Sequence, residues 1–151
     1  MSIYCRILVA VDGSISATAA LSQAIALAMD QDATLRIAHV IDTVTLNAET
    51  LEGLEGFEEA MRHAGWQVLS DAEGVALRAG LRAETVLLEI GRLREHIADT
   101  IARNALEWRA DVIVLATHGR RGLTRLLMGS VAESLVRVAT TTILLTRGRE
   151  G

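Results

Sequence analysis

In LATHGRRGLTRLLMGSVAESLV, residues 115–136, an apolar run breaks into a loop rich in glycine and arginine, and an amphipathic segment follows the loop. In that segment and just beyond it, Val131, Leu135 and Val138 recur at the spacing of one helical face. An apolar strand, a glycine-rich turn and a helix make up one βα unit, which is the building block of parallel sheets. The question is how many such units the rest of the chain holds, and what the loop binds.

Five short segments rich in branched apolar residues predict strands, and four amphipathic segments alternate with them. The predicted strands cover residues 3–12, 33–42, 82–91, 110–117 and 140–147. This alternation is typical of a doubly wound α/β fold with a mostly parallel sheet. The 151 residues contain no linker, repeat or low-complexity tract, so we expect a single domain over residues 1–151.

The first three helices are predicted from apolar residues at helical spacing, with Ser14 or Ser16 placed to cap the first. An acidic stretch with two glycines, residues 43–56, predicts an exposed loop that covers the site or contacts a partner. Trp66 and Trp108 fall on helices and are expected to pack. The apolar faces of these helices are predicted over residues 17–28, 57–75 and 93–106.

Composition excludes several classes of function. Half of the residues are hydrophobic and only 3% are aromatic, which predicts an aliphatic core. The net charge is −4 and all 15 cations are arginine, so we expect no nucleic-acid partner, and no Walker-type lysine is present. A lone Cys5, expected as filler in or beside the first strand, rules out a disulfide framework.

The sequence also predicts where the protein is located. It has no apolar run of membrane-spanning length and too few apolar residues near its start for a signal peptide. We therefore expect a cytoplasmic protein without a membrane partner.

The loop of the opening stretch has the chemistry of a phosphate site. Gly119 and Gly122 allow positive φ or close approach of a ligand to the backbone. Gly129 and Ser130 open the next helix, where free N–H groups and the positive end of the helix dipole favour an anion. Further phosphate charge could be neutralised by Arg120, Arg121 or Arg125. The alternative is structural: the glycines form turns, Ser130 is an N-cap and the arginines are solvated.

Three separated segments together resemble the ATP-binding type of the universal stress protein (UspA) family. That type carries G-x2-G-x9-G-[S/T] after the fourth strand, and here the pattern is Ala116-x2-Gly119-x9-Gly129-Ser130. ILVAVDGS near the start and HVID after the second strand agree in order and spacing. The resemblance implies an adenine-nucleotide α-hydrolase-like fold: a doubly wound five-stranded parallel sheet, order 3-2-1-4-5, with four helices.

The resemblance also implies a nucleotide site for ATP, ADP or AMP, with Mg²⁺. Asp12 would lie near the ribose and the metal-bound phosphates, and is a possible metal ligand through nucleotide-bound Mg²⁺; a turn-forming role for its side chain is the alternative. Val40 would meet adenine through its backbone, or would be ordinary strand core. The implied nucleotide-binding residues are Ala10, Val11, Asp12, Val40, Leu115, Ala116, His118, Gly119, Arg120, Gly129, Ser130 and Val131.

Two positions in the motif need separate interpretation. Ala116 stands where the pattern has its first glycine, so its methyl group is expected to weaken binding without abolishing it. His118 is expected to hydrogen-bond within the turn, because the sequence offers it no partner carboxylate or nucleophile for catalysis. The other histidines lie on separate elements and do not form a metal set.

The sequence favours a binding module over an enzyme. The main hypothesis is a stress-response protein in which ATP occupancy signals to an unknown downstream protein, with at most slow hydrolysis. The alternative is a nucleotide-hydrolysing or nucleotidyl-transfer enzyme that uses Asp12 and the loop from Gly119 to Ser130. A phosphoacceptor receiver domain is set aside, since the chain has no lysine and lacks a second aspartate after the third strand.

The last predicted strand, residues 140–147, is apolar on both faces and would lie at the sheet edge. An exposed edge of this kind invites aggregation unless it is paired. The family pairs this strand with its copy across a two-fold axis, so the resemblance implies a homodimer through residues 140–147.

Overall fold

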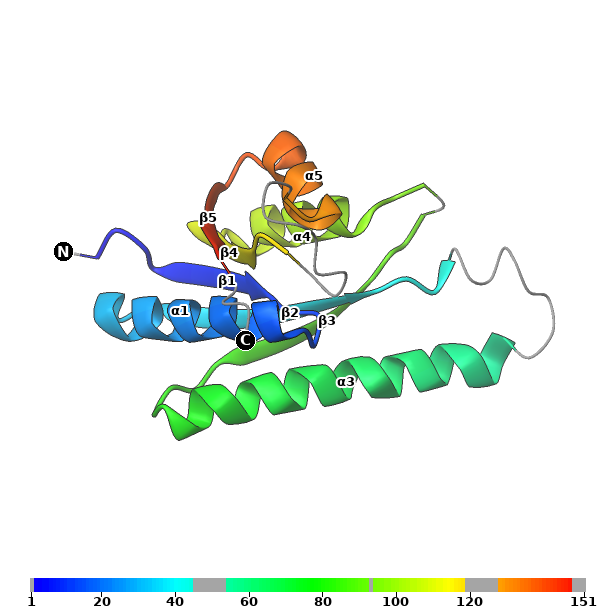
Figure 1. Cartoon of the computed structure of the whole chain (residues 1–151), viewed down its shortest axis with the longest axis horizontal. Helices are drawn as coiled ribbons and strands as arrows, with labels where there is room; N and C mark the ends of the chain where they lie inside the picture. Colours follow the sequence, from blue (N-terminus) through cyan, green and yellow to red (C-terminus); the bar gives the residue numbers. More distant parts are fainter. Residues whose placement is uncertain (1, 45–53, 93, 119–127, 148–151) are drawn as a thin grey trace.

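The computed structural model describes residues 2–44, 54–92, 94–118 and 128–147. Its five strands are β1 (Arg6–Ala10), β2 (Thr34–Ile41), β3 (Glu84–Glu89), β4 (Val112–Ala116) and β5 (Thr142–Thr146). They form one sheet in the order β3-β2-β1-β4-β5 with every neighbouring pair parallel, which confirms the predicted topology (Figure 1).

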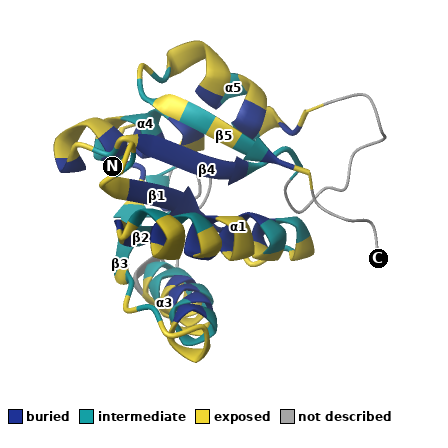
Figure 2. Cartoon of the chain, turned by 90° about the vertical axis from the view of Figure 1, so that its left-hand side faces the viewer, coloured by how far each residue is buried: buried dark blue, intermediate teal, exposed yellow. Residues whose placement is uncertain are grey.

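Helices cover both faces of this sheet (Figures 1 and 2). The pair α1 (Ile15–Gln31) and α3 (Leu54–Arg78) lies on one face, and the pair α4 (Ile97–Trp108) and α5 (Ser130–Val138) lies on the other. The alternating side chains of β1 show the division, since Ile7 and Val9 join the core beneath α1 and α3 while Leu8 and Ala10 join the core beneath α4 and α5. The central strands are therefore buried on both faces, as parallel strands between helical layers must be.

The turn from β1 into α1 follows from three consecutive residues. Asp12 Oδ1 accepts a hydrogen bond from the Ser14 amide at 2.9 Å, and Gly13 takes φ +82°, which a residue with a Cβ adopts only at a cost. Ser14 then caps α1 by accepting from the Ala17 amide at 3.1 Å, so of the two predicted capping residues Ser14 is the one used.

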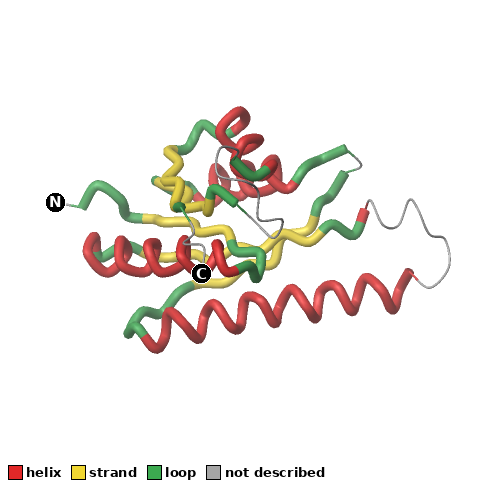
Figure 3. Tube along the Cα trace, in the orientation of Figure 1, coloured by secondary structure: helices red, strands yellow, loops and turns green. Residues whose placement is uncertain are grey.

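The observed elements, which Figure 3 shows along the chain, differ from the predicted ones mainly at their ends. Each strand is shorter than its predicted run by one or more residues at each end. α3 begins at Leu54, inside the region expected to be a loop over residues 43–56; residues 45–53 of that region lie outside the described part of the chain.

Several residues expected to be buried are exposed. Phe57 is 47% exposed because α3 extends beyond the strands beneath it. The 25 residues of α3 span about 37 Å, whereas the longest strand, β2, has 8 residues and spans about 26 Å. Trp66, expected to pack, lies off the apolar stripe of α3 and is 50% exposed, whereas Trp108 is buried as expected. Leu106 and Val138 also face solvent, and Cys5 is exposed ahead of β1 instead of filling the core.

No helix within the described residues is long and apolar enough to cross a membrane.

Candidate functional site

The main candidate site is a cavity of about 820 Å³ at the carboxyl ends of β1, β2 and β4. In this sheet the strand order reverses between β1 and β4, and ligands of open parallel sheets bind at such a point. The volume lies within the range of about 300–1,000 Å³ that is typical of small-molecule sites.

Ten of the twelve residues predicted to bind nucleotide line this one cavity. They come from the ends of three strands and the start of α5, namely Ala10, Val11, Asp12, Val40, Leu115, Ala116, His118, Gly129, Ser130 and Val131. The remaining two, Gly119 and Arg120, lie outside the described residues, as do Gly122, Arg121 and Arg125. The fold thus brings residues separated by as many as 121 positions around one space, and their role in binding stays a prediction.

The walls of the cavity are largely apolar and form a slot between the ends of the strands. Val40 and Ala10 face the α4 and α5 side, where they pack with Leu115 and Val131. A flat, weakly polar group such as a purine ring fits walls of this kind.

The amino end of α5 closes one side of the cavity with backbone donors. Gly129 is the N-cap and donates its own N–H to the Thr117 carbonyl at 2.6 Å, and within the described residues no side chain caps the helix. Ser130, Val131 and Ala132, the first three residues of the helix, all line the cavity. Since the first N–H groups of a helix have no partner within it, this end of α5 is suited to hold an anion. One part of the structural alternative is wrong, since the N-cap is Gly129 and not Ser130. Its other parts concern Gly119, Gly122 and the loop arginines, which lie outside the described residues.

Asp12 enters the cavity wall from the turn after β1. Its hydrogen bond to the Ser14 amide is the turn-forming contact that was considered as an alternative to ligand binding. The two roles are compatible, because an ionised carboxylate can accept several hydrogen bonds at its two oxygens.

His118 makes the hydrogen bond expected of it within the turn, since its Nδ1 lies 3.1 Å from the Thr117 hydroxyl oxygen. Its other ring nitrogen, Nε2, is buried without a hydrogen-bond partner in the described part of the chain. A buried, unpartnered ring nitrogen beside a cavity can serve as a contact for a polar ligand group.

Sequence reasoning missed the walls that α3 and α4 contribute. Met61, Ala64 and Val68 on α3 line the cavity, and so do Ile97 and Ile101 on α4. Their helical spacing predicted an apolar face, which was interpreted as core only. His39 on β2 was also missed; its Nδ1 lies 2.7 Å from the Val11 carbonyl oxygen.

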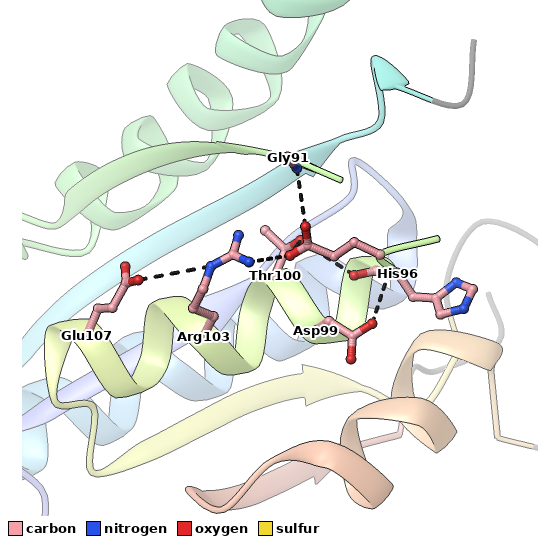
Figure 4. Close-up of polar contacts among 7 residues, drawn as sticks. Gly91, His96, Asp99, Thr100, Arg103 and Glu107 are labelled. Carbon is pink, nitrogen blue, oxygen red and sulfur yellow. Dashed lines mark hydrogen bonds and ion pairs between the residues drawn. The ribbon is translucent and has the colours of Figure 1, made fainter. Parts of the chain in front are cut away.

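The α4 wall is held by a polar cluster in the connection from β3 (Figure 4). The side chain of Glu95, only 8% exposed, pairs with Arg103 and accepts hydrogen bonds from the Thr100 hydroxyl at 3.1 Å and the Gly91 amide at 3.3 Å. Burial raises the pKa of Glu95, but the hydrogen bonds from Thr100 and Arg103 and the arginine charge outweigh it, so the pKa of this carboxyl is lowered. The charged carboxylate therefore ties the end of β3 to the first turns of α4.

The described residues contain no group of three or more histidine, cysteine, aspartate or glutamate side chains placed to hold a metal ion. Any metal at Asp12 would therefore need further ligands from a bound molecule or from water, which is how Mg²⁺ commonly binds beside phosphates.

The molecule belongs to the doubly wound α/β domains, and its ligand-sized cavity lies at the switch point of the sheet, where such domains commonly bind small molecules. Comparison with known proteins makes the assignment more specific. The sequence pattern of the Universal stress protein family matches residues 4–147, and the chain belongs to this family.

Individual relatives agree with that assignment. A Staphylococcus aureus (strain USA300) protein classed as a universal stress protein is 35% identical over 150 residues, which cover 99% of this chain and 88% of the relative. The crystal structure of a universal stress protein family member from Burkholderia pseudomallei is similar with a TM-score of 0.75 at 33% identity, covering 97% of this chain and 98% of the other. The universal stress protein from Archaeoglobus fulgidus in complex with dAMP has a TM-score of 0.66 at 25% identity, covering 95% and 98%.

Proposed function

We propose that this chain is an adenine-nucleotide-binding signalling module of the cytoplasm. In this proposal it binds ATP with Mg²⁺, or ADP or AMP, in the cavity beyond β1 and β4, and nucleotide occupancy changes how it engages a downstream protein. It acts as a homodimer paired through β5, and it is not primarily an enzyme.

One observation carries the proposal. The amino end of α5, which no side chain of the described residues caps, opens into the same cavity as the apolar slot of Ala10, Val40 and Leu115. A nucleotide has the same two-part chemistry, an apolar ring joined to an anionic tail. The two halves of the cavity therefore match the two halves of the ligand.

Residues of different chemistry would bind different parts of the nucleotide. Main-chain N–H groups at the start of α5 and the Ser130 hydroxyl would hold phosphate oxygens, and His118 Nε2 would contact a polar group of the ligand. Val40 would meet the purine, and Asp12 would accept from a ribose hydroxyl or hold nucleotide-bound Mg²⁺. The complex of the A. fulgidus relative with dAMP supports an adenine nucleotide as the ligand class.

We propose at most slow hydrolysis. Phosphoryl-transfer enzymes of the P-loop type use a lysine on the β- and γ-phosphates and a residue that orients the attacking water. The sequence contains no lysine, and Asp12 is the one carboxylate that the sequence pattern assigns to the nucleotide. Turnover of several ATP per minute that disappears in Asp12→Ala would instead support the alternative of a nucleotide-hydrolysing or nucleotidyl-transfer enzyme.

Equilibrium binding of labelled ATP with Mg²⁺ tests the proposal. We expect saturable binding, and we expect Ser130→Asp to weaken it at least about tenfold, because a carboxylate at the start of α5 repels phosphate. Ser130 is exposed and an acidic residue suits the first turn of a helix, so this variant should stay folded.

The matched control is Ser134→Asp, which adds the same charge to α5 one turn later, at a residue that does not line the cavity. It should bind ATP as the unmodified protein does. No measurable binding of ATP, ADP or AMP at millimolar concentration would refute the proposed function.

A further inference from the structure

A side-chain hydrogen bond continues the attachment between β1 and β2 beyond the point where their strand pairing ends. The pairing register of the two strands ends at Ala10 and Ala38. The next residue, Val11, donates its N–H to the Ala38 carbonyl at 2.9 Å, and its own carbonyl oxygen lies 2.7 Å from His39 Nδ1. Because a carbonyl oxygen can only accept, Nδ1 must carry the proton and donate it.

This contact lies immediately ahead of the turn that forms the cavity wall. Val11 is 8% exposed, and the residue after it is Asp12, whose Oδ1 accepts from the Ser14 amide. The N–H of Val11 fixes the peptide plane that enters this residue, and its carbonyl fixes the next plane, which leads into Asp12. Of these two contacts, the one that orients the plane leading into Asp12 comes from the imidazole.

Helix α3 holds the imidazole of His39 in place from the other side. Gly65 of α3 is buried, and a Cβ at that position would lie 3.4 Å from His39 Cδ2, 3.2 Å from Ile41 Cγ2 and 2.7 Å from Leu87 Cδ1. A glycine lets the helix backbone pack directly on β2 and β3, which leaves the imidazole little room to turn away from the Val11 carbonyl.

We propose that His39 is a positioning residue for ligand binding, which fixes the Val11 carbonyl through its Nδ1–H and thereby sets Asp12 at the cavity. The role of His39 in nucleotide affinity rests on the proposed function, because it requires that the protein binds a nucleotide. Its structural part, the dependence of the turn on the imidazole, can be measured without any ligand.

The variants His39→Asn and His39→Leu separate the hydrogen bond from the shape of the side chain. Their side chains have nearly the same branched shape, but only asparagine carries an N–H at about the position of Nδ1. We expect His39→Leu to weaken ATP binding about fivefold to tenfold, the size of one neutral hydrogen bond, and His39→Asn to retain most of the affinity. Equal affinities of the two variants would overturn the proposal.

A double-mutant cycle tests whether His39 acts through Asp12. If it does, His39→Leu should change ATP affinity by less than about twofold in a protein that already carries Asp12→Ala, because the residue to be positioned is gone. Fully additive losses would show that His39 contacts the nucleotide directly, or acts elsewhere, and would overturn the positioning role.

Amide hydrogen exchange of the ligand-free protein gives the second readout. In His39→Leu the Ser14 amide, which donates to Asp12, should exchange at least about fivefold faster, while in His39→Asn it should stay protected. If the unmodified protein binds no nucleotide, the proposed function fails, yet this exchange rate still decides the role of His39. Unchanged Ser14 exchange in His39→Leu would overturn it.

Discussion

Ala116 is the residue at which the chain departs from the sequence pattern of the ATP-binding family members. It ends β4 and lines the cavity, and its side chain packs against the core beneath α1 and α3. Its methyl group therefore contributes to packing while it occupies part of the space that a glycine would leave to a ligand. We therefore expect this single methyl group to have opposite effects on stability and on affinity.

We expect Ala116→Gly to raise the affinity for ATP by about twofold to tenfold and to lower the free energy of unfolding by about 0.5–1 kcal/mol. The affinity rises because the ligand gains room, and stability falls because glycine loses more backbone entropy on folding than alanine. Titration with ATP and urea denaturation measure the two quantities on the same preparation.

Ala110→Gly is the matched control for this change. Ala110 precedes the same strand at its other end, is also half-buried and does not line the cavity. It should lose similar stability with no gain in affinity. An equal affinity gain in both variants would point to a general loosening of the protein and contradict the local role of Ala116.

Among the elements, the connection from β3 to α4 shows how a polar cluster can shape an apolar wall. Glu95 itself does not line the cavity, but its hydrogen bonds join Gly91 to Thr100 in the first turns of α4 (Figure 4). Ile97 and Ile101 of the same turns line the cavity. Arg94 in this connection takes φ +75°, an uncommon conformation for a residue with a side chain. The Glu95 hydrogen bonds help to hold the connection in that conformation.

Glu95→Gln is expected to lower the free energy of unfolding by about 1–2 kcal/mol at neutral pH, because it removes the charge from a buried, hydrogen-bonded carboxylate. The folded-state pKa of Glu95 is lowered, so its stabilising contribution is present above the ordinary pKa of 4.5 and is lost as the pH falls through the lower folded-state value. The difference between the variant and the unmodified protein should therefore shrink below about pH 4.5. Urea denaturation at neutral and acidic pH measures it.

The control for this prediction is Glu107→Gln on the same helix. The side chain of Glu107 is 67% exposed and lies 4.0 Å from Arg103, the residue that also pairs with Glu95. An exposed pair of this kind contributes little, so the control should change stability by less than about 0.5 kcal/mol. Equal losses in the two variants would contradict the role given to the buried carboxylate.

At the scale of the whole molecule, the sheet edge formed by β5 is the surface through which we propose that the chain dimerises. β5 lies at one edge, as predicted, and one of its faces packs beneath α5 through Ile143 and Leu145. On its other face Leu144 is 41% exposed and lines a groove together with Ile15 of α1, which is 82% exposed. An edge strand with exposed apolar side chains beside it suits pairing with a second copy.

Leu144→Glu should convert the proposed dimer to a monomer, because pairing would bury the added charge. Light scattering at micromolar concentration measures the molar mass, and circular dichroism checks that the fold is kept. Leu77→Glu, at a residue of α3 that is 52% exposed and distant in the fold from β5, is the control and should remain a dimer. A monomeric unmodified protein would contradict the dimer proposal.

The order of strands and helices and the turn at Asp12, Gly13 and Ser14 could be predicted from the sequence. Hydrophobic periodicity reports which face of an element is apolar, and glycine and capping residues report where the chain turns; both signals act over a few residues. The family resemblance added the positions that would meet a nucleotide. Ten of these positions lie around one cavity, because parallel strands bring their carboxyl ends to the same edge.

Only the tertiary structure decided which apolar faces became walls of the cavity and which became core or solvent-exposed surface. Met61 and Ile101 line the cavity while Phe57 and Leu106 are exposed, although all four lie at helical spacing. The contact between His39 and Val11 joins residues 28 positions apart. Such contacts depend on how whole elements pack against each other, and the periodicity of a single element carries no information about its partner.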